Sequence, residues 1–249
     1  MRKLGLLGYP LGHSFSKKYY LDKFRREEIR DIDYDLYAIA DVRDFQHLYA
    51  DDERFYGFNV TIPHKQAIMP FLNELSAEAE AIQAVNCITV ARRNGKPYLK
   101  GYNTDTVGFE ESLKPLLKPQ HHKALVFGNG GAAKAVFYVL QKLSIPYLVV
   151  SRTKEKGDLT YSELDGDVLR EHQILINCSP VGTFPKVDEA PDIPYSFIGE
   201  DHLLYDLIYN PEETLFLRRG RERGAVTKNG FEMLVIQAEK NWEIWNNAQ

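Results

Sequence analysis

Residues 123–142 of this chain, KALVFGNGGAAKAVFYVLQK, decide how it folds. A short apolar run over residues 124–127 leads into the glycine-rich segment 128–132. A helical pattern follows, in which Ala133, Val136 and later apolar residues share one face. A strand, a glycine turn and a helix in this order are typical of the start of a dinucleotide-binding βαβ unit. Glycines let backbone N–H groups approach a diphosphate, and the helix start adds unpaired N–H groups and a partial positive charge.

The glycine pattern departs slightly from the common form G-x-G-x-x-G/A. Gly128, Gly130 and Ala133 fill its three fixed positions, and Gly131 is an extra glycine. An ordinary strand-to-helix turn can also contain glycines, so the pattern alone leaves both interpretations open. The strand pattern before it and the helical pattern after it favour a diphosphate site. That site would comprise Gly128, Asn129, Gly130, Gly131 and Ala132.

The next strand, over residues 147–150, leads into a basic loop that indicates which dinucleotide binds. In such units an acidic residue at this tip binds the ribose hydroxyl of NAD, whereas a basic residue accommodates the 2′-phosphate of NADP. Arg152 stands at the tip, and Lys154 and Lys156 add positive charge nearby. The basic loop therefore indicates a preference for NADP over NAD. The alternative is an ordinary solvated loop that binds no cofactor.

The length and composition of the chain exclude several classes of function. The chain has 249 residues, enough for one large or two small domains, and a formal net charge of −4, which argues against general nucleic-acid binding. Its two cysteines, Cys87 and Cys178, are far apart, so we expect neither a disulfide framework nor a metal site. The sequence shows no apolar stretch of membrane-spanning length and no secretory pattern after Met1, so we expect a cytoplasmic protein without a membrane partner.

The part of the chain before the glycine turn has its own strands and helices. Strand patterns cover residues 4–7, 33–38 and 55–60, and a hairpin with an Asn-Gly turn covers residues 85–99. Helical patterns lie between them. We therefore predict a two-domain α/β protein with a cleft between the domains.

Several polar residues in this first part stand where strands end. Ser14 and Ser16 could cap the following helix, or they could face the crevice where α/β sheets bind ligands. Lys65 follows Pro63 near a predicted helix N-terminus, which is the unfavourable end of the helix dipole for a cation. That position favours a functional lysine over a solvated surface lysine. Asp105 could be either a helix cap or a functional carboxylate.

Separate stretches of the sequence together resemble the shikimate dehydrogenase family. They are residues 8–16, 59–65, 84–86, 101–105, 128–132, 151–153, 176–177, 205–211 and 229–237, in the family's order and over nearly the whole chain. The combination of N-V-T-x-P-x-K, N-T-D and a final M-L-V-x-Q is specific. The resemblance implies an NADP-dependent oxidoreductase that interconverts 3-dehydroshikimate and shikimate, in the pathway to chorismate and the aromatic amino acids.

The resemblance also implies a domain plan. Residues 1–101 would form the substrate-binding and catalytic domain, and residues 102–231 a Rossmann-type NADP-binding domain. Residues 232–249 would form a helix that returns to pack on the N-terminal domain.

The site residues follow from the same resemblance. Lys65 and Asp105 would be the catalytic pair. The substrate would be bound by Ser14 and Ser16 at its carboxylate, by Thr61, Asn86, Asp105 and Gln237 at its ring hydroxyls, and by Tyr209, with Asn59 bordering the pocket. NADP would be bound by residues 128–132, by Ser151, Arg152 and Thr153 around the 2′-phosphate, and by Met233 near the nicotinamide.

Two positions depart from the family pattern. Ser151 stands where asparagine is usual, and Asn129 where alanine is common. A further basic contact could come from Lys154 or from Lys156. The alternative functions are a quinate/shikimate dehydrogenase using NAD, a non-catalytic ligand-binding protein of this fold, and a methyltransferase, which Arg152 disfavours. Both a monomer and a homodimer remain open.

Overall fold

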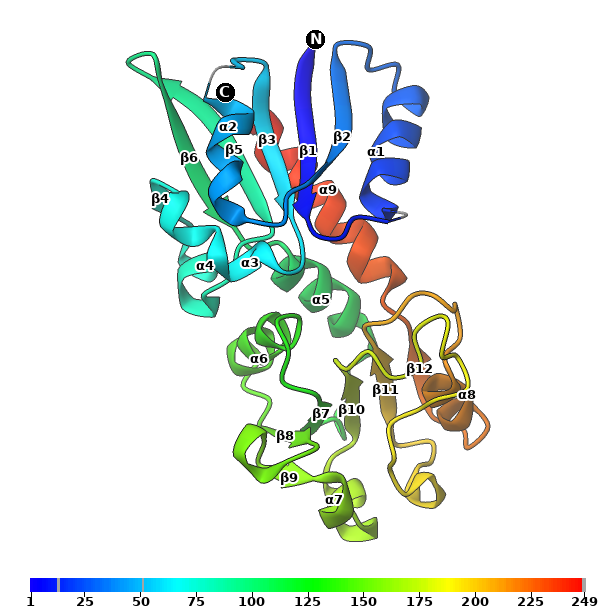
Figure 1. Ribbon diagram of the computed structural model, residues 1–249. Helices are drawn as coiled ribbons and strands as arrows, with labels where there is room; N and C mark the ends of the chain where they lie inside the picture. Colours follow the sequence, from blue (N-terminus) through cyan, green and yellow to red (C-terminus); the bar gives the residue numbers. More distant parts are fainter. Residues whose placement is uncertain (13, 51, 248–249) are drawn as a thin grey trace. The chain divides into compact units, whose positions relative to one another are not determined.

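A computed structural model describes residues 1–12, 14–50 and 52–247 (Figure 1). His13, which belongs to one of the family-like stretches, lies outside the described residues. The chain divides into two compact units. The N-terminal unit comprises Met1–Thr104 and Ala238–Gln249, and the central unit comprises Asp105–Gln237. The domain limits expected at residues 101 and 231 stay predictions, because compactness does not test which ligand each unit binds.

The N-terminal unit is built on one mixed sheet with the strand order β2-β1-β3-β5-β6-β4. Its strands are β1 (Arg2–Gly8), β2 (Ile32–Ala38), β3 (Phe55–Val60), β4 (Glu74–Leu75), β5 (Cys87–Arg93) and β6 (Lys96–Tyr102). Strands β1, β2 and β3 are parallel, whereas β5 is antiparallel to both of its neighbours. The predicted Asn94-Gly95 turn joins β5 to β6, and both turn residues have positive φ angles of 52° and 74°.

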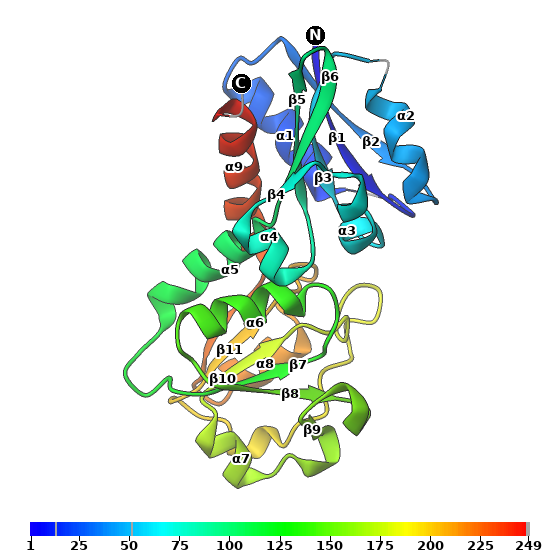
Figure 2. The same cartoon turned by 90° about the vertical axis from the view of Figure 1, so that its left-hand side faces the viewer.

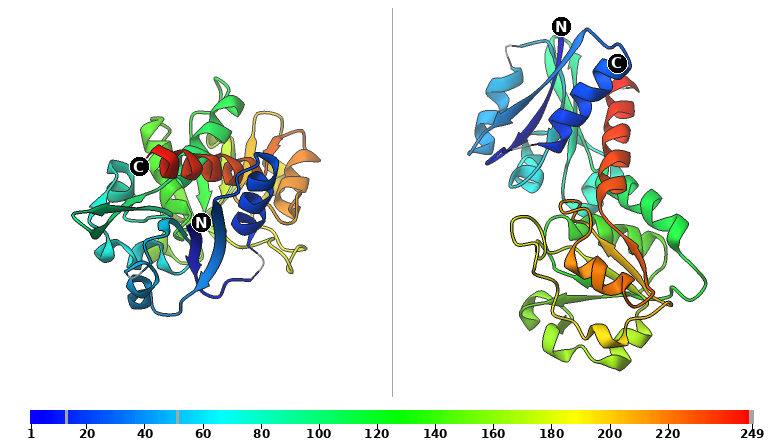
Figure 3. Two further views of the ribbon diagram at one scale, coloured as in Figure 1. Left: turned by 90° about the horizontal axis from the view of Figure 1, so that it is seen from above. Right: turned by 90° about the vertical axis from the view of Figure 1, so that its right-hand side faces the viewer.

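Helices cover both faces of this sheet. They are α1 (Phe15–Arg26), α2 (Phe45–Tyr49), α3 (His64–Ala67), α4 (Ala77–Ile82) and the C-terminal part of α9 (Phe231–Asn247). Tyr20 of α1 and Trp245 of α9 pack with Leu4 on one face, and Figure 3 shows these two helices side by side. Phe45 of α2 packs with Leu7 on the other face. Successive residues of a strand point to opposite faces, so Leu4 and Leu7 of β1 belong to two separate cores, one on each side of the sheet.

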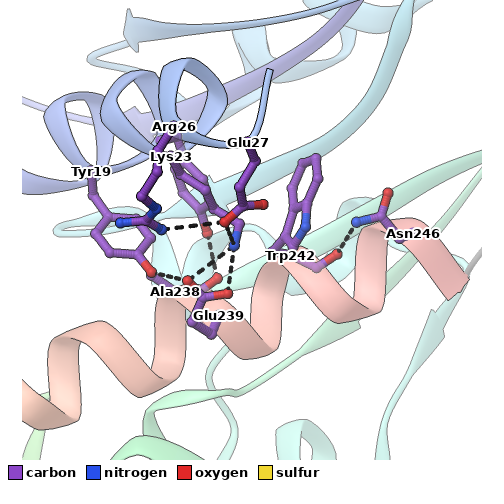
Figure 4. Close-up of polar contacts among 9 residues, drawn as sticks. Tyr19, Lys23, Arg26, Glu27, Ala238, Glu239, Trp242 and Asn246 are labelled. Carbon is purple, nitrogen blue, oxygen red and sulfur yellow. Dashed lines mark hydrogen bonds and ion pairs between the residues drawn. The ribbon is translucent and has the colours of Figure 1, made fainter. Parts of the chain in front are cut away.

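Ion pairs fix α9 against α1 (Figure 4). The Lys23 ammonium donates to Glu27 at 2.9 Å and to Glu239 at 2.8 Å, and the Tyr19 hydroxyl donates to the same Glu239 carboxylate. Burial of Lys23 lowers its pKa, but the hydrogen bonds to Glu239 and Glu27 outweigh this and raise the pKa overall. Lys23 therefore stays charged and links the two helices.

Buried aromatic residues complete this attachment. The Trp245 side chain is 1% exposed, and its Nε1 donates to the Ile88 carbonyl at 3.0 Å. The Tyr20 hydroxyl donates to the Ala238 carbonyl at 2.8 Å. The expected return of the C-terminal helix to the N-terminal domain is confirmed.

The central unit has a fully parallel sheet with the strand order β12-β11-β10-β7-β8-β9. Its strands are β7 (Ala124–Phe127), β8 (Tyr147–Ser151), β9 (Leu159–Thr160), β10 (Ile174–Asn177), β11 (Leu203–Asp206) and β12 (Val226–Lys228). Counted along the sheet from the other edge, this is the doubly wound order 3-2-1-4-5-6. The strand order reverses between β7 and β10, which is where such sheets bind nucleotides.

Helices also cover both faces of the central sheet (Figure 2). They are α5 (Asp105–Leu113), α6 (Ala133–Lys142), α7 (Gly166–Glu171) and α8 (Leu215–Arg221). Phe109 of α5 and Val136 of α6 pack on one face, and Leu169 of α7 and Phe216 of α8 pack on the other. Since both faces are covered, β7 is buried along its whole length, as its continuous apolar sequence requires. The α/β class and the Rossmann-type topology are confirmed.

Candidate active site

The polar residues of the N-terminal unit gather at one edge of its sheet because of strand direction. Strands β1, β3 and β6 end at this edge, and the antiparallel strand β5 begins there. Leu7 pairs with Val60, and Cys87 pairs with Asn59 on one side and Tyr102 on the other. Residues that follow β1, β3 and β6 and residues that precede β5 therefore share one edge, although the sequence separates them widely.

Asn86 and Thr104 form the centre of this edge. The Asn86 Nδ2 donates to Thr104 Oγ1 at 3.0 Å, and the Thr104 backbone N–H donates to Asn86 Oδ1 at 2.8 Å. The Thr104 hydroxyl donates to Asn241 Oδ1 of α9 at 2.6 Å. These buried contacts fix the backbone immediately before Asp105, which is the first residue of α5.

A second chain of hydrogen bonds connects Asn86 to α1. The Asn59 amide donates to the Asn86 carbonyl at 3.3 Å and accepts from the Tyr34 hydroxyl at 2.8 Å. The Tyr34 hydroxyl is also hydrogen-bonded by Ser16. Burial raises the pKa of Tyr34 well above its ordinary value, so this hydroxyl stays neutral and available as a donor. The half-buried Ser16 is thus connected to the buried polar network of Tyr34, Asn59 and Asn86.

The backbone around Lys65 is held from three sides. The His64 N–H donates to the Thr61 carbonyl at 2.9 Å, and the buried His64 ring contacts the Ile39 carbonyl at 2.6 Å. The Lys65 carbonyl accepts from the Val85 N–H at 2.7 Å. Thr61 and Lys65 therefore lie at the same sheet edge as Asn86. No role was predicted for His64, whose ring contact with the Ile39 carbonyl holds the start of α3, where Lys65 lies.

Ser14 caps the helix that follows β1. Its Oγ accepts from the Lys17 backbone N–H at 3.4 Å, which is one of the two roles considered from the sequence. The side chain also lines a cavity of about 420 Å³ together with Lys17 and Lys18. Asp22 and Arg25 line the same cavity, and the Lys17 ammonium donates to the Asp35 carboxylate at 2.6 Å, so the lining carries charges of both signs.

The glycine turn of the central unit meets the requirements of a diphosphate site. It lies directly after β7, at the point where the strand order reverses. Gly128 has a φ of +102°, and an added Cβ would lie 3.2 Å from the Ser179 backbone N, so a side chain would be strained there. At Gly130 and Gly131 the space above the backbone is open. Within the described residues, no side chain caps the first turn of α6, so its N–H groups suit a diphosphate.

The loop after β8 presents the basic residues. Arg152 and Thr153 are exposed, whereas Ser151 is buried and its hydroxyl accepts from the Thr153 N–H at 3.3 Å. The Lys154 ammonium donates to the Asp158 carbonyl at 2.6 Å and to Glu163 at 2.8 Å. That last hydrogen bond is the main reason why the pKa of Glu163 falls to about 2. Lys154 therefore braces the loop itself.

A buried carboxylate lies between two other loops at the same edge of the central sheet. Asp206, at the end of β11, is fully buried and accepts from Thr214 Oγ1 at 2.6 Å, from the Ile208 N–H at 3.0 Å and from Asn177 Nδ2 at 3.1 Å. Burial raises its pKa to about 6, although these hydrogen bonds oppose the rise. No individual role was predicted for Asp206. The sequence signal that could have indicated a buried carboxylate is an acid directly after the apolar run 203–205.

The remaining predicted residues of the central unit lie on α9 and after β11. Met233 and Gln237 are one helical turn apart and both buried, and α5 approaches them closely at Gly108, where an added Cβ would lie 2.4 Å from the Met233 carbonyl. Met233 belongs to the apolar core of this unit. Tyr209 is 40% exposed. The contacts of these three residues with ligands stay predictions.

The structure thus places each predicted residue within one of two groups. The first lies at the edge of the N-terminal sheet and comprises Ser14, Ser16, Asn59, Thr61, Lys65 and Asn86. The second belongs to the central unit and comprises Asp105, residues 128–132, Ser151, Arg152, Thr153, Tyr209, Met233 and Gln237. The pairing of Lys65 with Asp105 joins the two groups and stays a prediction. Among the described residues, no acid, histidine and cysteine cluster could hold a metal ion, and no helix has the length and apolarity to cross a bilayer.

Known proteins match both the sequence and the fold. The model of the shikimate dehydrogenase substrate binding domain matches residues 6–88. A shikimate dehydrogenase (NADP(+)) of Methanococcus maripaludis is 35% identical over 275 residues, which cover 99% of this chain and 92% of the relative. One of Desulforamulus reducens is 34% identical, covering 97% and 88%. The crystal structure of shikimate 5-dehydrogenase from Thermus thermophilus, in complex with NADP(H) and shikimate, has a TM-score of 0.84 at 28% identity, covering 99% and 94%.

Proposed function

This chain belongs to the shikimate dehydrogenase family, and we propose that it reversibly reduces 3-dehydroshikimate to shikimate with NADPH. This reaction is a step of the shikimate pathway, which leads to chorismate and the aromatic amino acids. The observation that carries the proposal is the edge of the N-terminal sheet, where Thr61, Lys65 and Asn86 lie together. Hydroxyl, amide and ammonium groups at one edge suit a polyhydroxylated ketone.

The chemistry requires a hydride on carbon and a proton on oxygen. NADPH, when bound, supplies the hydride, so the chain must supply the proton and stabilise the charge that develops on the oxygen. We assign both tasks to Lys65, with Asp105 as its catalytic partner. A carboxylate beside an ammonium group favours the protonated form and fixes its direction.

The substrate contacts follow from the same edge. Ser14 and Ser16 are assigned to the carboxylate of the substrate, and Thr61, Asn86, Asp105 and Gln237 to its ring hydroxyls, with Tyr209 on the substrate side. Asn86 supports this assignment because its amide is held rigidly by Thr104. A fixed amide binds a hydroxyl without a large ordering cost.

The cofactor assignment rests on the central unit. Residues 128–132 suit the diphosphate through their backbone N–H groups, and Ser151, Arg152 and Thr153 are assigned to the 2′-phosphate side, with Met233 near the nicotinamide. Of the two lysines left open by the sequence, Lys156 is the better candidate for the 2′-phosphate, because the Lys154 ammonium is bonded to Glu163. The guanidinium of Arg152 offers a planar fork for phosphate oxygens.

The remaining expectations complete the proposal. Residues 1–101 would hold the substrate, residues 102–231 the NADP, and residues 232–249 the returning helix. We expect a cytoplasmic monomer or homodimer that acts on small molecules and needs neither nucleic acid nor a membrane.

A turnover assay tests this function. The full chain is assayed with shikimate and with quinate, each with NADP and with NAD, and in the reverse direction with 3-dehydroshikimate and NADPH. We expect the highest turnover with shikimate and NADP. Equal or higher turnover with quinate and NAD would instead identify a quinate/shikimate dehydrogenase, and ligand binding without turnover would identify a non-catalytic protein.

A further inference from the structure

The glycine turn and the loop after β8 are tied together by one side chain. Asn129 is exposed, and its Nδ2 donates to the Lys156 carbonyl at 3.0 Å. The two residues belong to different loops of the central unit, one after β7 and one after β8. A diphosphate contact would use the backbone of the turn, so the Asn129 side chain has a separate task.

The second loop is braced at its other points. The Lys154 ammonium holds the Asp158 carbonyl and Glu163, and the Thr153 N–H donates to Ser151 Oγ. Asp158 is fixed in turn, because its carboxylate accepts from the Val149 N–H at 2.8 Å. These contacts hold the loop to itself and to β8, whereas the Asn129 contact sets its position against the glycine turn.

That position matters because both loops would bind parts of one molecule. The diphosphate and the 2′-phosphate of NADP are separated by a covalent linkage of limited length. A loop that is already placed at the matching distance loses less conformational freedom when the ligand binds. NAD lacks the 2′-phosphate, so its affinity does not depend on the placement of the basic side chains.

We propose that Asn129 is a positioning residue for cofactor preference, because it holds the main chain of Lys156 where the Lys156 ammonium can reach the 2′-phosphate of NADP. This inference rests on the proposed use of NADP. It makes Asn129 act through Lys156 and gives the Asn129 side chain no direct role at the diphosphate.

A double-mutant cycle tests the proposal on the full chain. The dissociation constants of NADP⁺ and NAD⁺ are measured by titration calorimetry for the wild type, Asn129→Ala, Lys156→Ala and the double variant. The control is Asn246→Ala, which removes another exposed asparagine whose Nδ2 donates to a backbone carbonyl, that of Trp242, at 2.9 Å (Figure 4). It should leave both affinities unchanged.

We expect Asn129→Ala to weaken NADP⁺ binding about 3- to 10-fold, the range for one hydrogen bond, and NAD⁺ binding less than about twofold. In the Lys156→Ala background, Asn129→Ala should weaken NADP⁺ binding by less than about twofold, because Asn129 acts only through the Lys156 ammonium, which this background lacks. An unchanged ratio of the two affinities, an equal loss for both cofactors, or fully additive effects would each overturn the positioning role. A wild type that binds NAD⁺ as tightly as NADP⁺ would overturn it too, and that result would mark the assigned cofactor as the error.

Discussion

The two units prepare their ligand-binding edges in different ways. In the N-terminal unit the polar residues are buried side chains, since Asn59, Asn86 and Thr104 are only 5%, 3% and 2% exposed and bond to one another or to neighbours. In the central unit the glycine turn and most of the basic loop are exposed, and backbone groups carry the proposed binding. Binding by fixed side chains is selective but sensitive to substitution, whereas binding by backbone tolerates many side chains.

The largest expected effect tests whether the chemistry belongs to the N-terminal edge. Lys65→Ala should lower kcat by about 10²- to 10⁴-fold, the usual contribution of a general acid, and leave the dissociation constant of NADP⁺ unchanged. Lys96→Ala, which removes an exposed lysine at the hairpin of the same sheet, is the control and should keep full turnover. Normal turnover of the Lys65 variant would mean that this lysine is an ordinary surface residue.

The next effect concerns the stability of the unit with the buried network. Trp245→Ala should destabilise the N-terminal unit by about 3–5 kcal/mol, because it leaves a cavity and removes the hydrogen bond to the Ile88 carbonyl. Both tryptophans of the chain lie in this unit, so urea unfolding followed by tryptophan fluorescence reports it directly. Trp242→Ala, at a half-buried position of the same helix, should cost clearly less. Equal losses would show that burial of Trp245 is not what holds α9.

A third prediction concerns the pH dependence of stability that comes from the buried carboxylate of the central unit. The pKa of Asp206 is raised to about 6 in the folded protein from an ordinary value of 3.8, so the folded state holds this proton more tightly than the unfolded state. Its contribution therefore lowers stability as pH rises from about 4 to 6, by roughly 3 kcal/mol in total.

Asp206→Asn removes this titration while keeping the shape of the side chain. Urea unfolding is followed by circular dichroism at pH values from 4 to 7.5. The free energy of unfolding of the variant, relative to that of the wild type, should rise by roughly 3 kcal/mol across that window. Exposed acids such as Glu163 titrate alike in both proteins and cancel in the difference. A difference that does not change with pH would contradict a raised pKa at Asp206.

The smallest effect tests the exposed loop. Arg152→Ala should weaken NADP⁺ binding about 10- to 100-fold, as expected for a lost hydrogen bond between charged groups, and change NAD⁺ binding less than about twofold. Arg170→Ala, at an exposed arginine on α7 of the same unit, is the matched control. Titration calorimetry with both cofactors gives the comparison. A parallel loss of both affinities would place Arg152 away from the 2′-phosphate.

The sequence was informative where structure is local. The apolar run before Gly128 and the helical pattern after it predicted β7 and α6 within a residue, because each pattern lies within one short stretch. Helix α5 ends at Leu113 and the chain continues as a 3₁₀ turn, since Pro115 cannot donate a backbone hydrogen bond and disfavours the α conformation before it. The short helix α7 and strand β9 were not predicted, because neither shows a clear periodic pattern.

The site was harder to predict where it depends on contacts between distant residues. Family-like stretches pointed to Asn86 and Lys65, but the contact of His64 with Ile39 and that of Asn129 with Lys156 depend on how separate loops meet. Asp206 is similar, since its burial results from three partners brought together by the sheet. Patterns within one sequence carry no signal for such pairs.

The N-terminal unit is assembled from both ends of the chain, and this has a consequence for biosynthesis. Its sheet emerges from the ribosome first, but Ala238 and Trp245, which cover one face, are added only after Asp105–Gln237. At about 5–20 residues per second, this delay is on the order of ten seconds. The central unit, continuous in sequence, can fold during that time. The nascent chain meanwhile presents Leu4, Tyr20 and Tyr34 without their cover, and this apolar surface stays open until residues 238–247 have been synthesised.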